Sequence, residues 1–158
     1  MIPAKPTTGA GGVRFRSRLE ARWAQWLTLC EWPWIYEPDL DLNGWIPDFG
    51  ITMGHGLLIE VKPAITMAGL IPHRERITRS GVVAPVWLVG GALSLGQRDY
   101  EPVLGWFGFD GGSNTWDWRP ARLWEVREQT VMHEPVDFKV AQRLWIQAGN
   151  ELQWKPRA

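Results

Sequence analysis

Three charged residues lie within a short stretch that otherwise has the composition of buried β-strands. Asp48, Glu60 and Lys62 occur in the sequence WIPDFGITMGHGLLIEVKP, which covers residues 45–63. Charged side chains are rarely buried unless they pair with one another or bind a metal ion. Two carboxylates about 4 Å apart repel each other by roughly 4 kcal/mol at an effective dielectric constant of 20. A divalent cation removes this repulsion, and hard oxygen ligands suit Mg²⁺ or Mn²⁺ rather than zinc.

Two short strands are expected to position these side chains. The sequence predicts one strand over residues 45–51 and the next over residues 57–61. Glu60 and Lys62 are two positions apart, so they share one face of their strand. Adjacent strands lie about 4.8 Å apart. Asp48 therefore approaches Glu60 if the register of the two strands allows it.

Each of these residues also has an alternative without function. Asp48 follows a proline and, taken alone, suits the end of a strand or a turn. Glu60 and Lys62 could form the solvated face of an edge strand. Leucine, isoleucine and valine occupy both faces of residues 57–61, which favours a central strand instead.

A helix is predicted over residues 17–30, before these strands. Ser17 stands three residues before Glu20, which is the spacing of a capping box. Apolar residues then recur at helical spacing and give one apolar stripe: Leu19, Trp23, Trp26, Leu27 and Cys30.

Further elements complete an α/β core over residues 13–91. A strand is predicted over residues 34–38, a helix over 69–80 and a buried strand within 84–91. The Asn-Gly pair at positions 43 and 44 predicts a hairpin turn between the first two strands. The resulting order is helix, three strands, helix and strand, which predicts a mixed central β-sheet flanked by helices.

The two ends of the chain are expected to add less to this core. Residues 1–12 are rich in proline, threonine and glycine and predict a flexible tail. Residues 92–158 predict a Trp- and Gly-rich extension packed on the core. Within this extension we expect a Gly-rich hairpin over residues 105–118 and a helix over 136–148, closed by a glycine at position 149.

Composition limits the class of protein. Apolar residues make up 45% and charged residues 22% of the 158 residues, which is typical of a globular fold. Seventeen basic residues balance seventeen acidic ones, so any nucleic-acid surface must be a local patch. A lone Cys30, the lack of a leader and the lack of an apolar run of about 18 residues indicate a cytoplasmic protein.

The charged stretch resembles the signature of the PD-(D/E)xK nuclease superfamily, which has a restriction-endonuclease-like fold. Pro47-Asp48 is followed, after eleven residues, by Glu60-Val61-Lys62. Many members also carry a glutamate in the preceding helix, and Glu20 in the sequence FRSRLEARWA is similar to it. The resemblance covers residues 13–91 and is strongest to small members encoded by phages or cutting transposon ends.

This resemblance implies a metal-dependent deoxyribonuclease, an endonuclease or a branched-DNA resolvase of phage or mobile-element origin. It implies that Asp48, Glu60 and the backbone carbonyl of Val61 bind Mg²⁺, for which Mn²⁺ substitutes. Lys62 would position the attacking water or stabilise charge on the phosphate. Glu20 would reach a second metal ion or a metal-bound water, although it could instead be only the capping partner of Ser17.

The expected partner is DNA, with a homodimer or a recombination or replication protein as a second partner. Two basic patches are candidates for phosphate contacts, with an ordinary solvated surface as the alternative for each: Arg74, Arg76 and Arg79 in the second helix, and Arg14, Arg16 and Arg18 before the first helix. The alternative function is a non-catalytic DNA-binding or structural subunit on the same fold. An intact carboxylate cluster favours the enzyme, since a pure binder of a polyanion does not need one.

Overall fold

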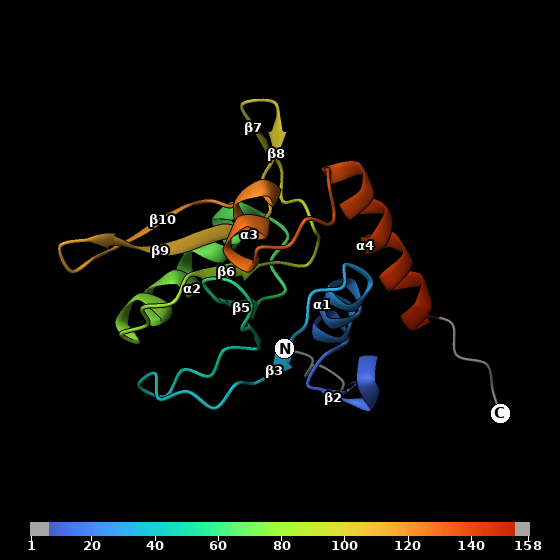
Figure 1. Cartoon of the computed structure of the whole chain (residues 1–158), viewed down its shortest axis with the longest axis horizontal. Helices are drawn as coiled ribbons and strands as arrows, with labels where there is room; N and C mark the ends of the chain where they lie inside the picture. Colours follow the sequence, from blue (N-terminus) through green and yellow to red (C-terminus); the bar gives the residue numbers. More distant parts are fainter. Residues whose placement is uncertain (1–6, 154–158) are drawn as a thin grey trace.

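A six-stranded mixed β-sheet forms the centre of the protein, as a computed structural model describing residues 7–153 shows (Figure 1). Its strands are β3 (Ile35–Tyr36), β4 (Phe49–Ile51), β5 (Leu57–Val61), β6 (Val86–Val89), β9 (Trp106–Gly112) and β10 (Thr115–Pro120). Their order across the sheet is β10-β9-β6-β5-β4-β3. The β5–β6 pair is parallel and the other pairs are antiparallel.

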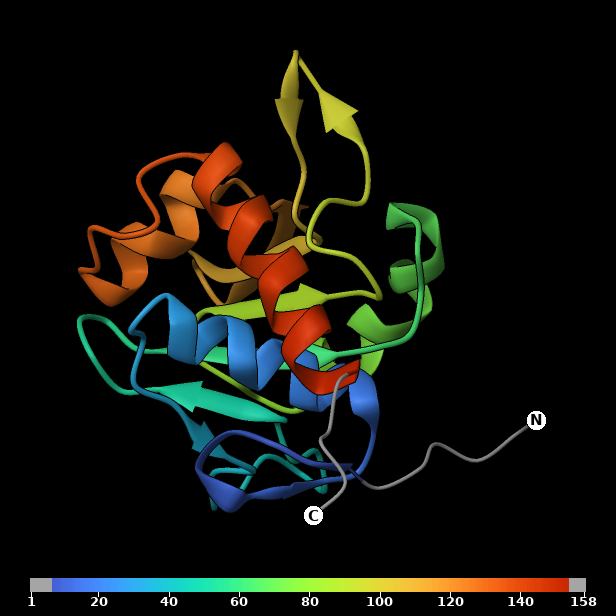
Figure 2. The ribbon, with the colours of Figure 1, turned by 90° about the vertical axis from the view of Figure 1, so that its right-hand side faces the viewer.

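Helices cover both faces of this sheet. On one face lie α1 (Arg18–Leu29), α3 (Leu123–Thr130) and α4 (Phe138–Gln153), with α4 crossing beside α1 (Figure 2). The other face packs against α2 (Met67–Arg79). The order α1, β3, β4, β5, α2, β6 confirms the predicted order of the core elements.

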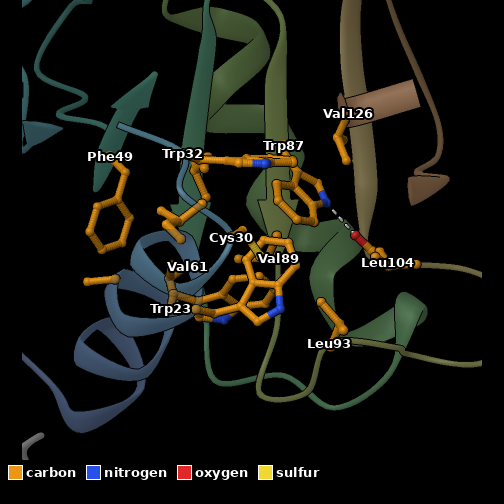
Figure 3. Close-up of a cluster of buried hydrophobic side chains, with 14 of the residues drawn as sticks. Trp23, Cys30, Trp32, Phe49, Val61, Trp87, Val89, Leu93, Leu104 and Val126 are labelled. Carbon is orange, nitrogen blue, oxygen red and sulfur yellow. Dashed lines mark hydrogen bonds between the residues drawn. The ribbon is translucent and has the colours of Figure 1, made fainter. Parts of the chain in front are cut away.

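Buried tryptophans tie distant segments together in the larger apolar cluster (Figure 3). The indole of Trp23 donates to the carbonyl oxygen of Gly90 at 2.9 Å, and that of Trp87 donates to Leu104 at 2.5 Å. A buried indole N–H needs such a partner, because leaving it unsatisfied costs about 1–3 kcal/mol. Trp23 thereby fixes α1 against the end of β6.

The strand predicted over residues 45–51 begins only at Phe49. Asn43 and Gly44 do form a two-residue turn, with φ values of 53° and 84°, and the Trp45 N–H donates to the Leu42 carbonyl at 3.1 Å. This turn lies inside a longer loop between β3 and β4, so the hairpin expected there is wider than predicted. The loop carries Trp45 against the α2 face of the sheet.

The expected N-terminal tail is partly structured. Within it, β1 (Thr7–Thr8) pairs with β2 (Arg14–Phe15), and a short 3₁₀ turn over Ala10–Gly12 joins them. Residues 1–6 lie outside the described residues.

The C-terminal part completes the same sheet rather than forming an appendage. The predicted hairpin is present as β9 and β10, and β9 pairs directly with β6. Helix α3 and a small hairpin of β7 (Gln97–Arg98) and β8 (Glu101–Pro102) were not predicted. Among residues 7–153, no helix has the length and apolar composition needed to cross a membrane.

The last helix does not end before Gly149 as predicted, but continues to Gln153. Gly149 is a point of close approach, since a Cβ atom there would lie 2.7 Å from the Cζ atom of Arg22. The Arg22 guanidinium donates two hydrogen bonds to the Trp145 carbonyl oxygen, at 2.8 and 3.1 Å, and lies over the Trp145 ring. The glycine therefore serves contact between α1 and α4, not helix termination.

Candidate active site

The register of β4 and β5 brings Asp48 opposite Glu60. Phe49 pairs with Ile59 in the antiparallel ladder, so one step further along places Asp48 across from Glu60 on the same face. The Asp48 carboxylate also accepts a hydrogen bond from the Val61 backbone N–H at 2.7 Å. The approach predicted from the sequence is therefore present.

The Glu60 carboxylate is held by two side chains. Glu60 is only 6% exposed, and its Oε2 atom accepts a hydrogen bond of 2.7 Å from the indole N–H of buried Trp45. The Lys62 ammonium lies 4.0 Å from the same oxygen, at the outer limit of an ion pair. Glu60 lies in β5, which is buried along its length, and the partly exposed Lys62 follows directly after the end of that strand.

The pair of carboxylates is electrostatically unfavourable without a cation. Burial, followed by the neighbouring Glu60 carboxyl, raises the pKa of Asp48 to about 8. The Val61 N–H and the charge of Lys62 oppose this shift but do not cancel it. Near neutral pH, Asp48 therefore retains a proton that an exposed aspartate would lose.

Glu20 lies in the first turn of α1 and makes the capping contacts with Ser17 that the spacing predicted. Its backbone N–H donates to the Ser17 hydroxyl at 3.1 Å, which caps the helix. Its side chain accepts from the Tyr36 hydroxyl at 2.6 Å and from the Ser17 hydroxyl at 3.1 Å. Burial raises the pKa of Glu20, and the Asp48 carboxyl, when ionised, raises it further, which places the two carboxyls within electrostatic reach.

Sequence reasoning assigns no role in the site to three side chains that contact or lie near its residues, and it predicts a structural role for Tyr36 among them. Tyr36 and Trp45 donate hydrogen bonds to Glu20 and Glu60, respectively. His73 on α2 is near Lys62, and burial together with the Lys62 charge lowers the pKa of this histidine. The residue types alone gave no signal, because the loop after Tyr36 and the packing of α2 decide which of them reach the site.

The predicted basic residues have partners within the protein. On α2, Arg79 pairs with Glu75 at 2.6 Å, Arg76 donates to the Gly44 carbonyl at 2.9 Å, and Arg74 lies over the Trp106 ring. Before α1, Arg16 pairs with Glu37 at 2.8 Å, and Arg18 donates to the Leu152 carbonyl at 3.0 Å. Apart from the half-buried Arg74, these side chains are exposed, so a phosphate could compete for them.

A metal ion would find two carboxylates rather than three at this edge. Within the described part of the chain, no group of three histidine, cysteine, aspartate or glutamate side chains is arranged to hold an ion. Asp48 and Glu60 supply hard oxygen donors, and both oxygens of Glu20 are engaged by Tyr36 and Ser17. The donor chemistry fits Mg²⁺ or Mn²⁺ at Asp48 and Glu60.

Comparison of this chain with protein-family models, with curated proteins and with solved structures gave no match.

Proposed function

We propose that the protein is a divalent-metal-dependent nuclease that hydrolyses phosphodiester bonds of DNA on a restriction-endonuclease-like core. The observation that carries this proposal is the pairing of Asp48 with Glu60 across β4 and β5, with Lys62 beside them. The raised pKa of Asp48, caused by burial and by Glu60, supports the proposal, because a bound cation would offset the same cost of placing charge there.

Asp48, Glu60 and the backbone carbonyl of Val61 would hold the ion. When bound, Mg²⁺ supplies polarisation of the scissile phosphate and activation of a water near neutral pH. The indole of Trp45 keeps the Glu60 carboxylate in one orientation through its 2.7 Å hydrogen bond. Lys62, as a cation at the edge of the site, stabilises the charge that develops on the phosphate.

Glu20 would act from the neighbouring helix. Its carboxyl lies within electrostatic reach of Asp48, and its raised pKa suits a group that exchanges a proton or a hydrogen bond with water. Contact with a water or a second ion requires one of its present partners, Ser17 or Tyr36, to give way.

The DNA would lie along α2 and the first turn of α1. Arg76 and Arg79 are exposed on α2, and Arg16 and Arg18 precede and begin α1. These arginines form two separate basic patches, one on α2 and one at the start of α1, on a protein whose net charge is zero.

The test compares Asp48→Asn and Lys62→Ala with the wild-type protein in Mg²⁺ and in Mn²⁺ on linear, single-stranded and branched DNA. Asp48→Asn should abolish cleavage and weaken divalent-ion binding in calorimetry, because the change removes charge and keeps shape. Lys62→Ala should bind Mn²⁺ normally while turnover falls by several orders of magnitude, as expected for a group acting in the transition state.

Asp41→Asn is the matched control, because Asp41 is an exposed aspartate in the same loop. If Asp48→Asn cleaves DNA at the wild-type rate, the assignment of Asp48 to the active site is wrong. If the wild-type protein binds DNA but neither cleaves it nor binds a divalent ion, the result would instead support a non-catalytic DNA-binding subunit.

A further inference from the structure

The β7–β8 hairpin projects away from the body of the protein in both views (Figures 1 and 2). We call residues 97–102 the finger. Its tip is a two-residue turn of Asp99 and Tyr100, whose φ values are 52° and 64°. This left-handed conformation favours Asn-Gly and is strained for a bulky residue such as tyrosine. Tyr100 is 99% exposed, so no burial of its ring offsets that strain.

Arg122 holds the finger through hydrogen bonds and ion pairs. The guanidinium of Arg122 donates hydrogen bonds to the carbonyl oxygens of Arg98 at 2.8 Å and Glu101 at 3.2 Å. It also pairs with the carboxylates of Asp99 at 3.9 Å and Glu101 at 3.4 Å. One partly buried cation therefore contacts both strands of the finger and offsets part of the negative charge of its two acidic groups.

The finger emerges from the sheet edge that carries the candidate active site. Strand β6 ends at Val89, which pairs in parallel with Val61, and the Lys62 N–H donates to the Val89 carbonyl at 3.0 Å. The chain runs from Val89 through residues 90–96 directly into the finger. A DNA molecule bound at Asp48 and Glu60 would therefore extend past this projection.

We propose that Tyr100 stacks on an unpaired base of the bound DNA, so that the preferred substrate is forked or branched rather than continuous duplex. This inference rests on the proposed nuclease function. Stacking needs only one open ring face, which a strained, fully exposed tyrosine on a braced finger provides. The charges of Arg98 and Arg122 together balance those of Asp99 and Glu101, so the finger carries no net negative charge that would repel phosphates.

A protein partner is a poorer fit to the same tip. Protein interfaces are built around several apolar or aromatic side chains that are buried together. The residues beside Tyr100 in the finger are exposed and polar or charged: Gln97, Arg98, Asp99 and Glu101. A single ring in such surroundings suits a base better than an apolar pocket.

The experiment measures binding in Ca²⁺ to a forked duplex with 2-aminopurine at its first unpaired position, and to the fully paired duplex. Fluorescence anisotropy gives affinity, and quenching of 2-aminopurine reports stacking. The wild-type protein should prefer the fork by about 5- to 100-fold, the range expected for one stacked base. Tyr100→Ala should lose both the preference and the quenching, and Tyr100→Phe should keep both.

Two further variants separate stacking from a structural role. Val83→Ala is the control, because Val83 is 79% exposed and precedes β6 at the opposite end of that strand. Tyr100→Gly should raise the melting temperature by relieving the left-handed backbone, yet should lose the fork preference. A purely structural tyrosine would show the reverse effect on stability.

Retention of fork preference and quenching by Tyr100→Ala would overturn the finger proposal while leaving cleavage by the protein untouched. A change confined to self-association in sedimentation would also overturn it, and would assign the finger to a protein contact. Failure of the wild-type protein to bind any of the DNAs would overturn the proposed function and this inference together.

Discussion

Asp48 is a residue whose charge costs the folded protein stability when no metal is bound. Its pKa is near 3.9 in an unfolded chain and is raised to about 8 in the fold by burial and by Glu60. The folded protein therefore holds a proton that the unfolded chain releases. This stabilisation is complete below about pH 4 and is lost as the pH rises to about 8, by up to about 1.4 kcal/mol per pH unit.

We expect the metal-free protein to melt at a lower temperature at pH 8 than at pH 5, and Mg²⁺ to raise the melting temperature at pH 8. Asp48→Asn should reduce the pH dependence and abolish the effect of Mg²⁺. Thermal unfolding at both pH values, with EDTA and with Mg²⁺, measures this, with Asp41→Asn as the exposed control. An identical pH dependence in Asp48→Asn and the wild type would contradict the electrostatic account.

Trp45 is expected to set the affinity of the site for metal without touching the ion. Trp45→Phe keeps most of the ring but removes the N–H that binds Glu60 at 2.7 Å. Loss of such a supporting hydrogen bond should weaken Mn²⁺ binding by about 10- to 100-fold in calorimetry. Trp118→Phe is the control, because its indole N–H binds Thr78 on α2 instead. Equal Mn²⁺ affinity in both variants would show that Trp45 only fills space.

At the scale of the elements, helix α1 was predictable because its start depends on neighbours in the sequence. Ser17 caps the helix through Glu20, and the apolar stripe faces the sheet as its spacing indicates. The tilt of α1 toward the site was not predictable, because it depends on contacts such as that of Trp23 with Gly90. The same applies to Glu20, whose second partner, Tyr36, lies on another element.

The elements that the sequence did not predict lack the usual residues at their turns and helix ends. Helix α3 ends at Val131 in a left-handed conformation, with φ of 52°, where glycine would have signalled the end. The finger turns on Asp99 and Tyr100 instead of Asn-Gly. In each case tertiary contacts, including those of Arg122 with the finger, hold a conformation that the residues alone disfavour.

The contact between α1 and α4 predicts a reversal in the effect of one substitution. Gly149→Ala alone should lower stability, because the new Cβ atom would displace the Arg22 guanidinium from the Trp145 carbonyl. In an Arg22→Ala background the same change should raise stability by about 1 kcal/mol, the usual gain of alanine over glycine in a helix. Chemical denaturation of the four proteins of this cycle measures the coupling, and additive effects would contradict the close approach.

At the scale of the whole molecule, a net charge of zero requires any DNA contact to be local. The double variant Arg76→Ala, Arg79→Ala should weaken binding to all DNA sequences. It should also flatten the slope of log affinity against log salt by about 1.8, at about 0.9 for each lost phosphate contact with duplex DNA. Anisotropy titrations in Ca²⁺ at several salt concentrations provide the slopes.

Arg143→Ala, an exposed change on α4, is the control for that measurement. An unchanged slope in the double variant would show that Arg76 and Arg79 on α2 make no phosphate contacts. The arginines around the start of α1 would then be the remaining candidates.

The site can form only after the C-terminal part of the chain has been synthesised. This follows from the pairing of β6 with β9 and from the contact of Trp26 with Ala141. All four side chains of the candidate site, Glu20, Asp48, Glu60 and Lys62, leave the ribosome early. The strand that completes their sheet and the helix that covers α1 are made only later, with residues 106–153. Such long-range pairing delays folding. A nascent chain would therefore carry the full set of carboxylates for some time before it could hold them in place, and any cleavage would begin only after α4 has docked.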